Sequence, residues 1–180
     1  MKPFFVVQTS YTFRSNTAPM HISFVELLLL ITLVASALMA GLFFAYACSV
    51  NPGLGRLADR GYLSAMQSIN RAILNPVFFA PFMGSLVLLP LATWAAWSSG
   101  GGWLLAATGM YFAGVFGVTI AGNVPLNNAL DKLELQAASE EQLAQYRANF
   151  EKRWNRLNLV RTVCAVLTLA LVGTACICQD

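Results

Sequence analysis

The sequence predicts an all-α membrane protein: a four-helix bundle with an amphipathic cytoplasmic helix and a long cytoplasmic extension of the fourth helix. Of its 180 residues, 57% are hydrophobic and only 11% are charged. A soluble domain carries roughly a quarter charged residues, so composition alone indicates a membrane protein. Four apolar segments each reach the ~20 residues that a membrane-spanning helix needs. They cover roughly residues 23–50, 77–97, 103–124 and 159–178.

Residues 23–180 are interpreted as a single four-helix transmembrane domain. Residues 1–22 form a polar N-terminal leader for which we expect little order, and Met20 is an alternative start to Met1. A cleaved signal peptide is the other interpretation of the first apolar segment. That segment is too long, because the apolar core of a signal peptide has only about 7–15 residues. We therefore expect a retained first helix.

The distribution of basic residues predicts which way the chain threads the membrane. Four spans place both termini on one side, where Lys2 and Arg14 are the only basic residues. The positive-inside rule then puts the two longer connections in the cytoplasm and both termini outside the cytoplasm, in a multi-pass protein of the cell (inner) membrane. A net charge of +3 gives no indication of a nucleic-acid partner. The basic residues of the other side are Arg56, Arg60, Arg71, Lys132, Arg147, Lys152, Arg153, Arg156 and Arg161.

Both long connections contain helix signals. Ser139 and Gln142 have the spacing of a capping box, and no proline follows before the fourth span. The pattern predicts one helix from about Glu140 through the membrane edge to Cys176. Met66, Ile69 and Ile73 recur at helical spacing and predict a short amphipathic helix between residues 59 and 74.

Small residues recur every four positions in two of the spans. This spacing allows membrane helices to approach closely, which would pair the first span with the third. Ordinary membrane-helix composition explains the same pattern equally well, and the sequence leaves the choice open. The two ladders are Ala37, Gly41, Ala45 and Ser49, and Gly109, Ala113, Gly117 and Ala121.

No residue cluster has the spacing of a metal or haem site. The four cysteines are interpreted as packing residues, because they fall within or at the ends of spans without a zinc-like arrangement. His21 and Glu26 could together bind a metal ion, but a single imidazole with one carboxylate is a small ligand set. We interpret them as an ordinary pair at the membrane interface. We therefore predict neither a metal nor a cofactor.

Asparagines gather on the predicted cytoplasmic side, where nine of the ten lie. Many suit helix ends, but Asn70 and Asn158 fall inside predicted helices, where a buried carboxamide without partners costs roughly 1–3 kcal/mol. The stretch NVPLNN (123–128) is either a helix stop aided by Pro125 or one wall of a polar site. Arg161 shares a helix face with Asn158 and Trp154. It either reaches lipid phosphate or serves as the cation of a polar pocket.

Four stretches of the sequence resemble those of the small four-helix anthrone oxygenase-like membrane proteins. They are GLFFAYACSVNPGLGRL (41–57), AMQSINRAILNPVFF (65–79), VTIAGNVPLNNAL (118–130) and WNRLNLVRT (154–162). The resemblance implies oxidation of anthrones to anthraquinones with O2, and no established metal or flavin. Fixed donors would then stabilise an enolate, and aromatic side chains would stack on a flat ring. No general base is apparent.

The residues that would carry these roles come from several helix ends. The catalytic candidates are Arg161, Asn158, Asn127, Asn123 and Asn70. The substrate-binding candidates are Trp154, Asn51, Asn75, Arg71, Phe43 and Phe44. The expected partners are the lipid bilayer, a lipophilic aromatic small molecule and a second copy of the chain in a homo-oligomer. The alternative is a non-enzymatic membrane protein that binds a lipophilic ligand or a protein partner.

Overall fold

The computed structural model describes residues 22–178, and within that range the chain consists of helices joined by short connections, with no strand. Apart from Ile22, the predicted N-terminal leader lies outside the described residues, as does His21. The elements in chain order are α1 (Phe24–Ala45), the π-helical turn η1 (Tyr46–Val50), α2 (Asn51–Leu54), α3 (Asp59–Ala72), α4 (Pro76–Ala95), α5 (Gly101–Met110), the π-helical turns η2 (Tyr111–Gly117) and η3 (Thr119–Asn123), α6 (Val124–Asp131) and α7 (Glu140–Ile177).

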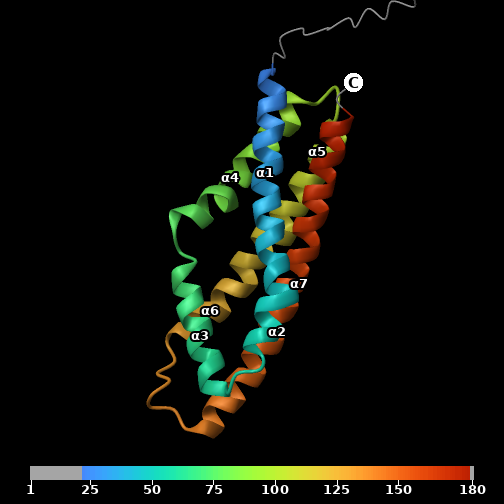
Figure 1. Cartoon of the computed structure of the whole chain (residues 1–180). Helices are drawn as coiled ribbons and strands as arrows, with labels where there is room; N and C mark the ends of the chain where they lie inside the picture. The colour runs from blue at the N-terminus through green and yellow to red at the C-terminus, as the bar shows by residue number, and fades with distance from the viewer. Residues whose placement is uncertain (1–21, 179–180) are drawn as a thin grey trace, which may run out of the picture.

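Four continuous helices in the described range are long and apolar enough to cross a membrane. The predicted all-α membrane bundle is therefore confirmed. In Figure 1 the start of α1 and the end of α7 lie at one end of the bundle, and α2, α3 and the first half of α7 lie at the other. We call these the terminal end and the α3 end. The spans are Phe24–Leu54, Pro76–Ala95, Gly101–Asp131 and Glu140–Ile177.

Side-chain caps fix where the longest helices begin. The Ser139 hydroxyl accepts from the Gln142 amide nitrogen at 3.3 Å, while the Gln142 side chain accepts from the Ser139 backbone N–H at 2.9 Å. This reciprocal pair is the predicted capping box, and α7 runs from it for 38 residues, as expected. Ser23 and Glu26 form the same arrangement at the start of α1. Glu26 is therefore engaged in a cap.

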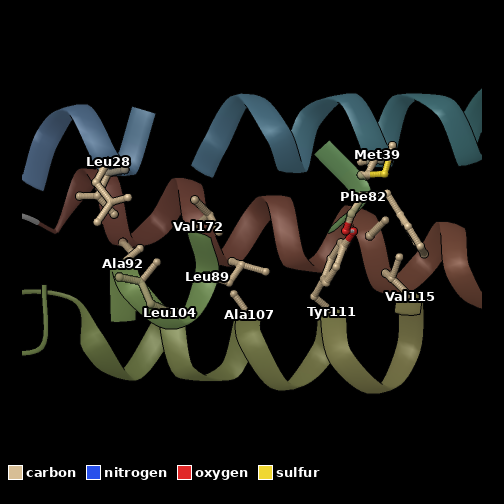
Figure 2. Packing of buried hydrophobic residues seen from close by; sticks show 14 of the residues in the cluster. Leu28, Met39, Phe82, Leu89, Ala92, Leu104, Ala107, Tyr111, Val115 and Val172 are labelled. Carbon is tan, nitrogen blue, oxygen red and sulfur yellow. Dashed lines mark hydrogen bonds between the residues drawn. The ribbon is translucent and has the colours of Figure 1, made fainter. Parts of the chain in front are cut away.

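α7 is the helix around which the bundle is organised. It packs against α1 on one side and α5 on the other, while α4 contacts the same two helices. Figure 2 shows Leu28, Leu89, Ala107 and Val172, one from each span, meeting in the shared core. From Trp154 onward, one series of buried side chains of α7 recurs at alternating steps of four and three, the spacing of left-handed helix packing. The series is Trp154, Asn158, Arg161, Ala165, Thr168, Val172 and Ala175, and Thr162 is buried beside it.

The first and third spans do not pair through their small-residue ladders. Ala37, Gly41, Ala45 and Ser49 are all exposed on the bundle surface, and so is most of the second ladder. A Cβ added at Gly109 would meet nothing within 4 Å, whereas one at Gly114 would lie 2.3 Å from the Cys164 sulfur on α7. The close approach is therefore between the third span and α7, through a glycine outside the ladder. The predicted homo-oligomer stays a prediction.

The third span does not stop at NVPLNN, which corrects the helix-stop interpretation. The helix continues through Pro125 to Asp131. Its buried residues Ala107, Tyr111, Val115, Thr119 and Asn123 recur every four positions. In an α-helix with 3.6 residues per turn, residues spaced four apart rotate gradually away from the buried face of the helix. The wider π-helical turns η2 and η3 counter this drift, so Asn123 still faces inward.

Two arginines hold the α3 end together. Arg147 of α7 donates to the backbone carbonyls of Gly55 and Leu57, at 2.8 and 2.7 Å, and forms an ion pair with Asp59 at 3.0 Å. Its guanidinium lies 4.5 Å from the centre of the Tyr62 ring. Burial raises the pKa of the Tyr62 hydroxyl above its ordinary range, so this ring stays neutral.

The second of these arginines, Arg60, bonds the carbonyls of Leu135 and Ala138 and the carboxylate of Glu140. These bonds dock α3 on the bundle. The amphipathic helix predicted between residues 59 and 74 is confirmed as α3. It buries Tyr62, Leu63 and Met66 against the first half of α7 and its neighbours.

Candidate functional site

A cavity of about 260 Å³ lies toward the α3 end, enclosed by α1, α3, α4, the third span and α7. Much of its wall is aromatic, with Phe43, Phe78, Phe82 and Trp154 among the lining residues. The Phe78 and Phe82 rings are stacked, with centroids 5.0 Å apart. The shape and apolar lining are typical of a site for a small lipophilic ligand.

Arg161 is the buried cation of this cavity and is only 7% exposed. It donates to the Asn158 side-chain oxygen at 3.0 Å and to the Thr119 hydroxyl at 3.4 Å. Neither partner is charged, and within residues 22–178 no carboxylate forms an ion pair with it. A buried charge is ordinarily paired. Arg161 is thus left with positive charge available to an anionic or electron-rich ligand.

Two aromatic faces flank the Arg161 guanidinium. Its central carbon lies 4.6 Å from the centre of the Phe43 ring and 5.5 Å from the centre of the Trp154 ring. Both distances suit a cation–π contact, which is strongest where water is excluded. The Trp154 indole N–H in turn donates to the Asn127 side-chain oxygen at 2.9 Å. These contacts hold the guanidinium and the indole in fixed positions at the cavity wall.

The polar face of α7 is tied to α1 through one carbonyl. The Phe43 carbonyl accepts from the Asn158 amide at 3.3 Å and from the Thr162 hydroxyl at 3.0 Å. The π-helical turn η1 begins three residues after Phe43 and changes the local backbone pairing. Asn158 therefore bridges this carbonyl and Arg161, and serves to position the guanidinium.

Several polar atoms of the cavity have no partner among the described residues. Both the nitrogen and the oxygen of the Asn123 side chain are buried and unbonded, although Asn123 is only 1% exposed. The Asn70 side-chain nitrogen and the Arg161 Nε are likewise unbonded. Unmet hydrogen-bonding groups of this kind each cost about 1–3 kcal/mol. The cavity thus offers three donors and one acceptor to a ligand.

An ion pair lies at the rim of the cavity. Arg71, one residue from the end of α3, and Asp131, the last residue of α6, are 2.6 Å apart and each more than half exposed. The wall also includes exposed apolar side chains from the spans, among them Met83 and Ile120. The cavity therefore combines a polar, charged rim with apolar lining side chains that are exposed on the surface of the spans.

The structure brings most of the predicted site residues to one place. The cavity lining includes Arg161, Asn158, Asn127, Asn123, Asn70, Trp154, Arg71 and Phe43. Three substrate-binding candidates lie elsewhere: Phe44 is 56% exposed on the outer surface of α1, Asn75 caps α4, and Asn51 faces a separate hollow beside α7. Phe43 and Phe44 are neighbours on one helix, and only Phe43 turns inward.

Tyr46 is a lining residue that the sequence did not single out. It is the first residue of η1, and its ring packs on Trp154 with centroids 5.7 Å apart. Its position three residues after Phe43 on the same helix was the available signal.

Within residues 22–178 no group of three or more His, Cys, Asp or Glu side chains is placed to hold a metal ion. Cys48, Cys164, Cys176 and Cys178 are all free thiols. The interpretation of the cysteines as packing residues agrees with this for Cys164 and Cys176, which are partly buried against the core.

Together these features define a class: a helical membrane protein with an aromatic cavity that encloses an unpaired arginine. A family model described as anthrone oxygenase matches residues 71–171, which include α4, the third span and most of α7. The chain belongs to the anthrone oxygenase family. Comparisons with curated proteins and with solved structures found no match.

Proposed function

We propose that the protein is a membrane oxygenase that uses O2 to oxidise a lipophilic aromatic ketone of the anthrone type in this cavity. The observation that carries the proposal is the buried, unpaired Arg161 beside the unbonded side chain of Asn123, within aromatic walls. Membership of the anthrone oxygenase family supports the reaction class. A flat ring would lie against Phe43 and Trp154, with its oxygen directed to Arg161.

The chemistry follows from the acidity of an anthrone. Loss of a proton from its methylene carbon gives an enolate whose negative charge rests on the ketone oxygen. Arg161 and the Asn123 amide are fixed donors in a largely water-excluded site, where charge stabilisation is strongest. The enolate carbon then bonds to O2, and after protonation gives a hydroperoxide. Loss of water from that hydroperoxide leaves the quinone. One anthrone and one O2 thereby give one anthraquinone and one water.

We further propose that the α3 end faces the cytoplasm of a bacterial-type inner membrane. This rests on the nine basic residues near that end against two in the leader. The ligand would then reach the cavity from the cytoplasmic leaflet, where Met83 and Ile120 are exposed.

The test is oxygen uptake by purified protein in lipid nanodiscs with anthrone as substrate. We expect one anthraquinone formed per O2 consumed. Arg161→Gln removes the charge and should lower kcat by about 10²–10³-fold, the usual loss for one donor to a developing oxyanion. Arg156→Gln, an exposed position on the same helix, is the matched control and should leave the rate unchanged.

Binding of anthrone without oxygen uptake would overturn the enzymatic proposal in favour of a ligand-binding membrane protein. Equal rates in Arg161→Gln and wild-type protein would overturn the assignment of the cavity as the reaction site.

A further inference from the structure

A second hollow lies between the η1–α2 segment and α7, and its volume is about 350 Å³. In Figure 1 this segment runs alongside α7 at the α3 end of the bundle. Among the described residues, none lines both this hollow and the aromatic cavity, so the two sites are separate. The residues that line the hollow include Ala47, Asn51, Gly55, Glu151, Asn155 and Leu159.

The hollow lies where the surface of α7 changes from charged to apolar. Lys152 and Arg156 are exposed on the side of the α3 end, whereas the exposed side chains that follow include Leu159 and Val163. On α1, Phe44 is exposed one turn before the hollow begins. In a membrane-spanning helix such a boundary marks the level of the lipid headgroups. A lipid whose chains lie along these apolar side chains therefore has its headgroup at the hollow.

Hydrogen-bond acceptors gather around Gly55 on the wall of the hollow. A Cβ at this residue would lie 3.2 Å from the Asn51 carbonyl oxygen, 3.4 Å from Glu151 Oε1 and 3.6 Å from the Pro52 carbonyl oxygen. The Asn155 side-chain oxygen is buried and has no partner within residues 22–178. We call these oxygens the acceptor cluster. Because glycine places no side chain among them, the cluster suits a ligand that donates hydrogen bonds.

The charges beside the acceptor cluster are unbalanced. Arg147 forms ion pairs with Asp59 at 3.0 Å and with Glu151 at 2.8 Å. Within residues 22–178 no other basic side chain pairs with either carboxylate, so two negative charges share one guanidinium. The bond from Arg147 uses Glu151 Oε2, while Oε1 lies beside Gly55. A cation in the hollow would balance the remaining negative charge.

We propose that the hollow binds the headgroup of phosphatidylethanolamine. The primary ammonium of this lipid has three N–H donors, which bond Glu151 Oε1, the Asn155 oxygen and a carbonyl oxygen of the acceptor cluster. Phosphatidylcholine lacks these donors, and proteins hold quaternary ammonium groups with aromatic faces instead. Among the described residues that line this hollow there is no aromatic side chain. Arg56, which follows Gly55 directly and is exposed, is available to the lipid phosphate.

Lipid binding by the purified, delipidated chain in detergent tests the site. Dioleoyl phosphatidylethanolamine and dioleoyl phosphatidylcholine differ only in methylation of the headgroup nitrogen, so comparing them isolates the N–H donors. Native mass spectrometry gives the affinity of each lipid. We expect the ethanolamine lipid to bind about tenfold more tightly or better, the effect of one hydrogen bond to a charged group. Equal affinities for the two lipids would overturn the inference.

Gly55→Ala is the sharpest variant, because its methyl group stands among the oxygens of the acceptor cluster. It should abolish the preference for the ethanolamine lipid. The matched control is Gly53→Ala, in α2, where a Cβ meets nothing within 4 Å and the preference should stay as in wild type. Asn155→Leu removes the unpartnered oxygen and should also abolish the preference, which keeps a test if Gly55→Ala does not fold. An unchanged preference in either folded variant, or an equal loss in Gly53→Ala, would overturn the role of the acceptor cluster.

Free ethanolamine distinguishes a lipid site from a site for a soluble amine. We expect no displacement of dioleoyl phosphatidylethanolamine by an equal concentration of ethanolamine, because the acyl chains on the apolar surface contribute to binding. Displacement at equal concentration would overturn the lipid as the occupant. None of these measurements involves anthrone or O2, so their outcome does not depend on the oxygenase proposal.

Discussion

The Arg161 guanidinium lies 4.6 Å from the centre of the Phe43 ring, and its strongest hydrogen bond, at 3.0 Å, is to the uncharged side chain of Asn158. A buried arginine without a carboxylate is a poor element of stability, because desolvation of the charge is incompletely offset. The arrangement is better suited to a ligand than to the fold. Removing the charge of Arg161 together with its polar partner should therefore maintain or raise stability, whereas removing the charge should weaken ligand binding.

The first prediction concerns the polar pair itself. Replacing both members, in Arg161→Met with Asn158→Leu, removes a buried charge and the polar group that would be left unbonded. We expect the thermal midpoint in nanodiscs to equal or exceed that of wild type. Asn158→Leu alone leaves Arg161 with only its 3.4 Å bond to Thr119 and should destabilise by about 1–3 kcal/mol. A double variant less stable than the single one would contradict this explanation.

The second prediction concerns the contact between the third span and α7. Gly114→Ala places a methyl group 2.3 Å from the sulfur and 2.6 Å from the Cβ of Cys164. The helices must then move apart, at a cost of about 1–3 kcal/mol. The control is Gly109→Ala, which meets nothing within 4 Å. Thermal unfolding should show a lower midpoint for Gly114→Ala only, and adding Cys164→Gly should restore it.

The third prediction concerns Arg147, which is 14% exposed at its side chain. Arg147→Lys keeps the charge but cannot reach Gly55, Leu57, Asp59 and Glu151 together, because lysine lacks the planar fork. We expect hydrogen exchange at residues 55–58 to accelerate at least tenfold. Lys152→Arg, on the exposed side of the same helix, should leave that exchange unchanged. Unaltered exchange in Arg147→Lys would show that the loop holds without this residue.

The fourth prediction concerns the rim pair Arg71 and Asp131. Both side chains are more than half exposed, so their attraction should contribute only about 0.2–1 kcal/mol to stability and weaken with salt. Asp131→Asn should leave the thermal midpoint nearly unchanged, yet speed both binding and release of a ligand that passes the rim. The charge-reversed double variant, Arg71→Asp with Asp131→Arg, should restore wild-type rates. Stopped-flow binding at low and high salt provides the measurement.

The sequence was enough to predict the four spans, the capping box of α7 and the gathering of asparagines with Arg161. These features depend on local composition and on helical spacing, which are read directly along the chain. The outward direction of Phe44 was not predictable, because it depends on how α1 rotates against α7. The inward position of Asn123 depends on η2 and η3, whose wider turns leave no clear mark in the sequence.

Tyr46 and Gly114 were missed for related reasons. Tyr46 matters because η1 places it beside Trp154, a contact between residues more than a hundred positions apart. Gly114 lies outside the ladder of small residues, and its importance appears only when Cys164 is placed against it. In both cases the decisive information is a contact between spans, which the periodicity of one span does not contain.

The central claim is that the cavity holds a flat aromatic ligand by its oxygen at Arg161. Its most direct test is the dissociation constant of 1,8-dihydroxyanthraquinone, a product-like probe, measured by fluorescence with protein in nanodiscs. A hydrogen bond to a charged group is worth about 1.5–3 kcal/mol, so Arg161→Met should weaken binding about 10- to 100-fold. Arg156→Met should bind like wild type. Equal affinity in Arg161→Met and wild-type protein would contradict the claim.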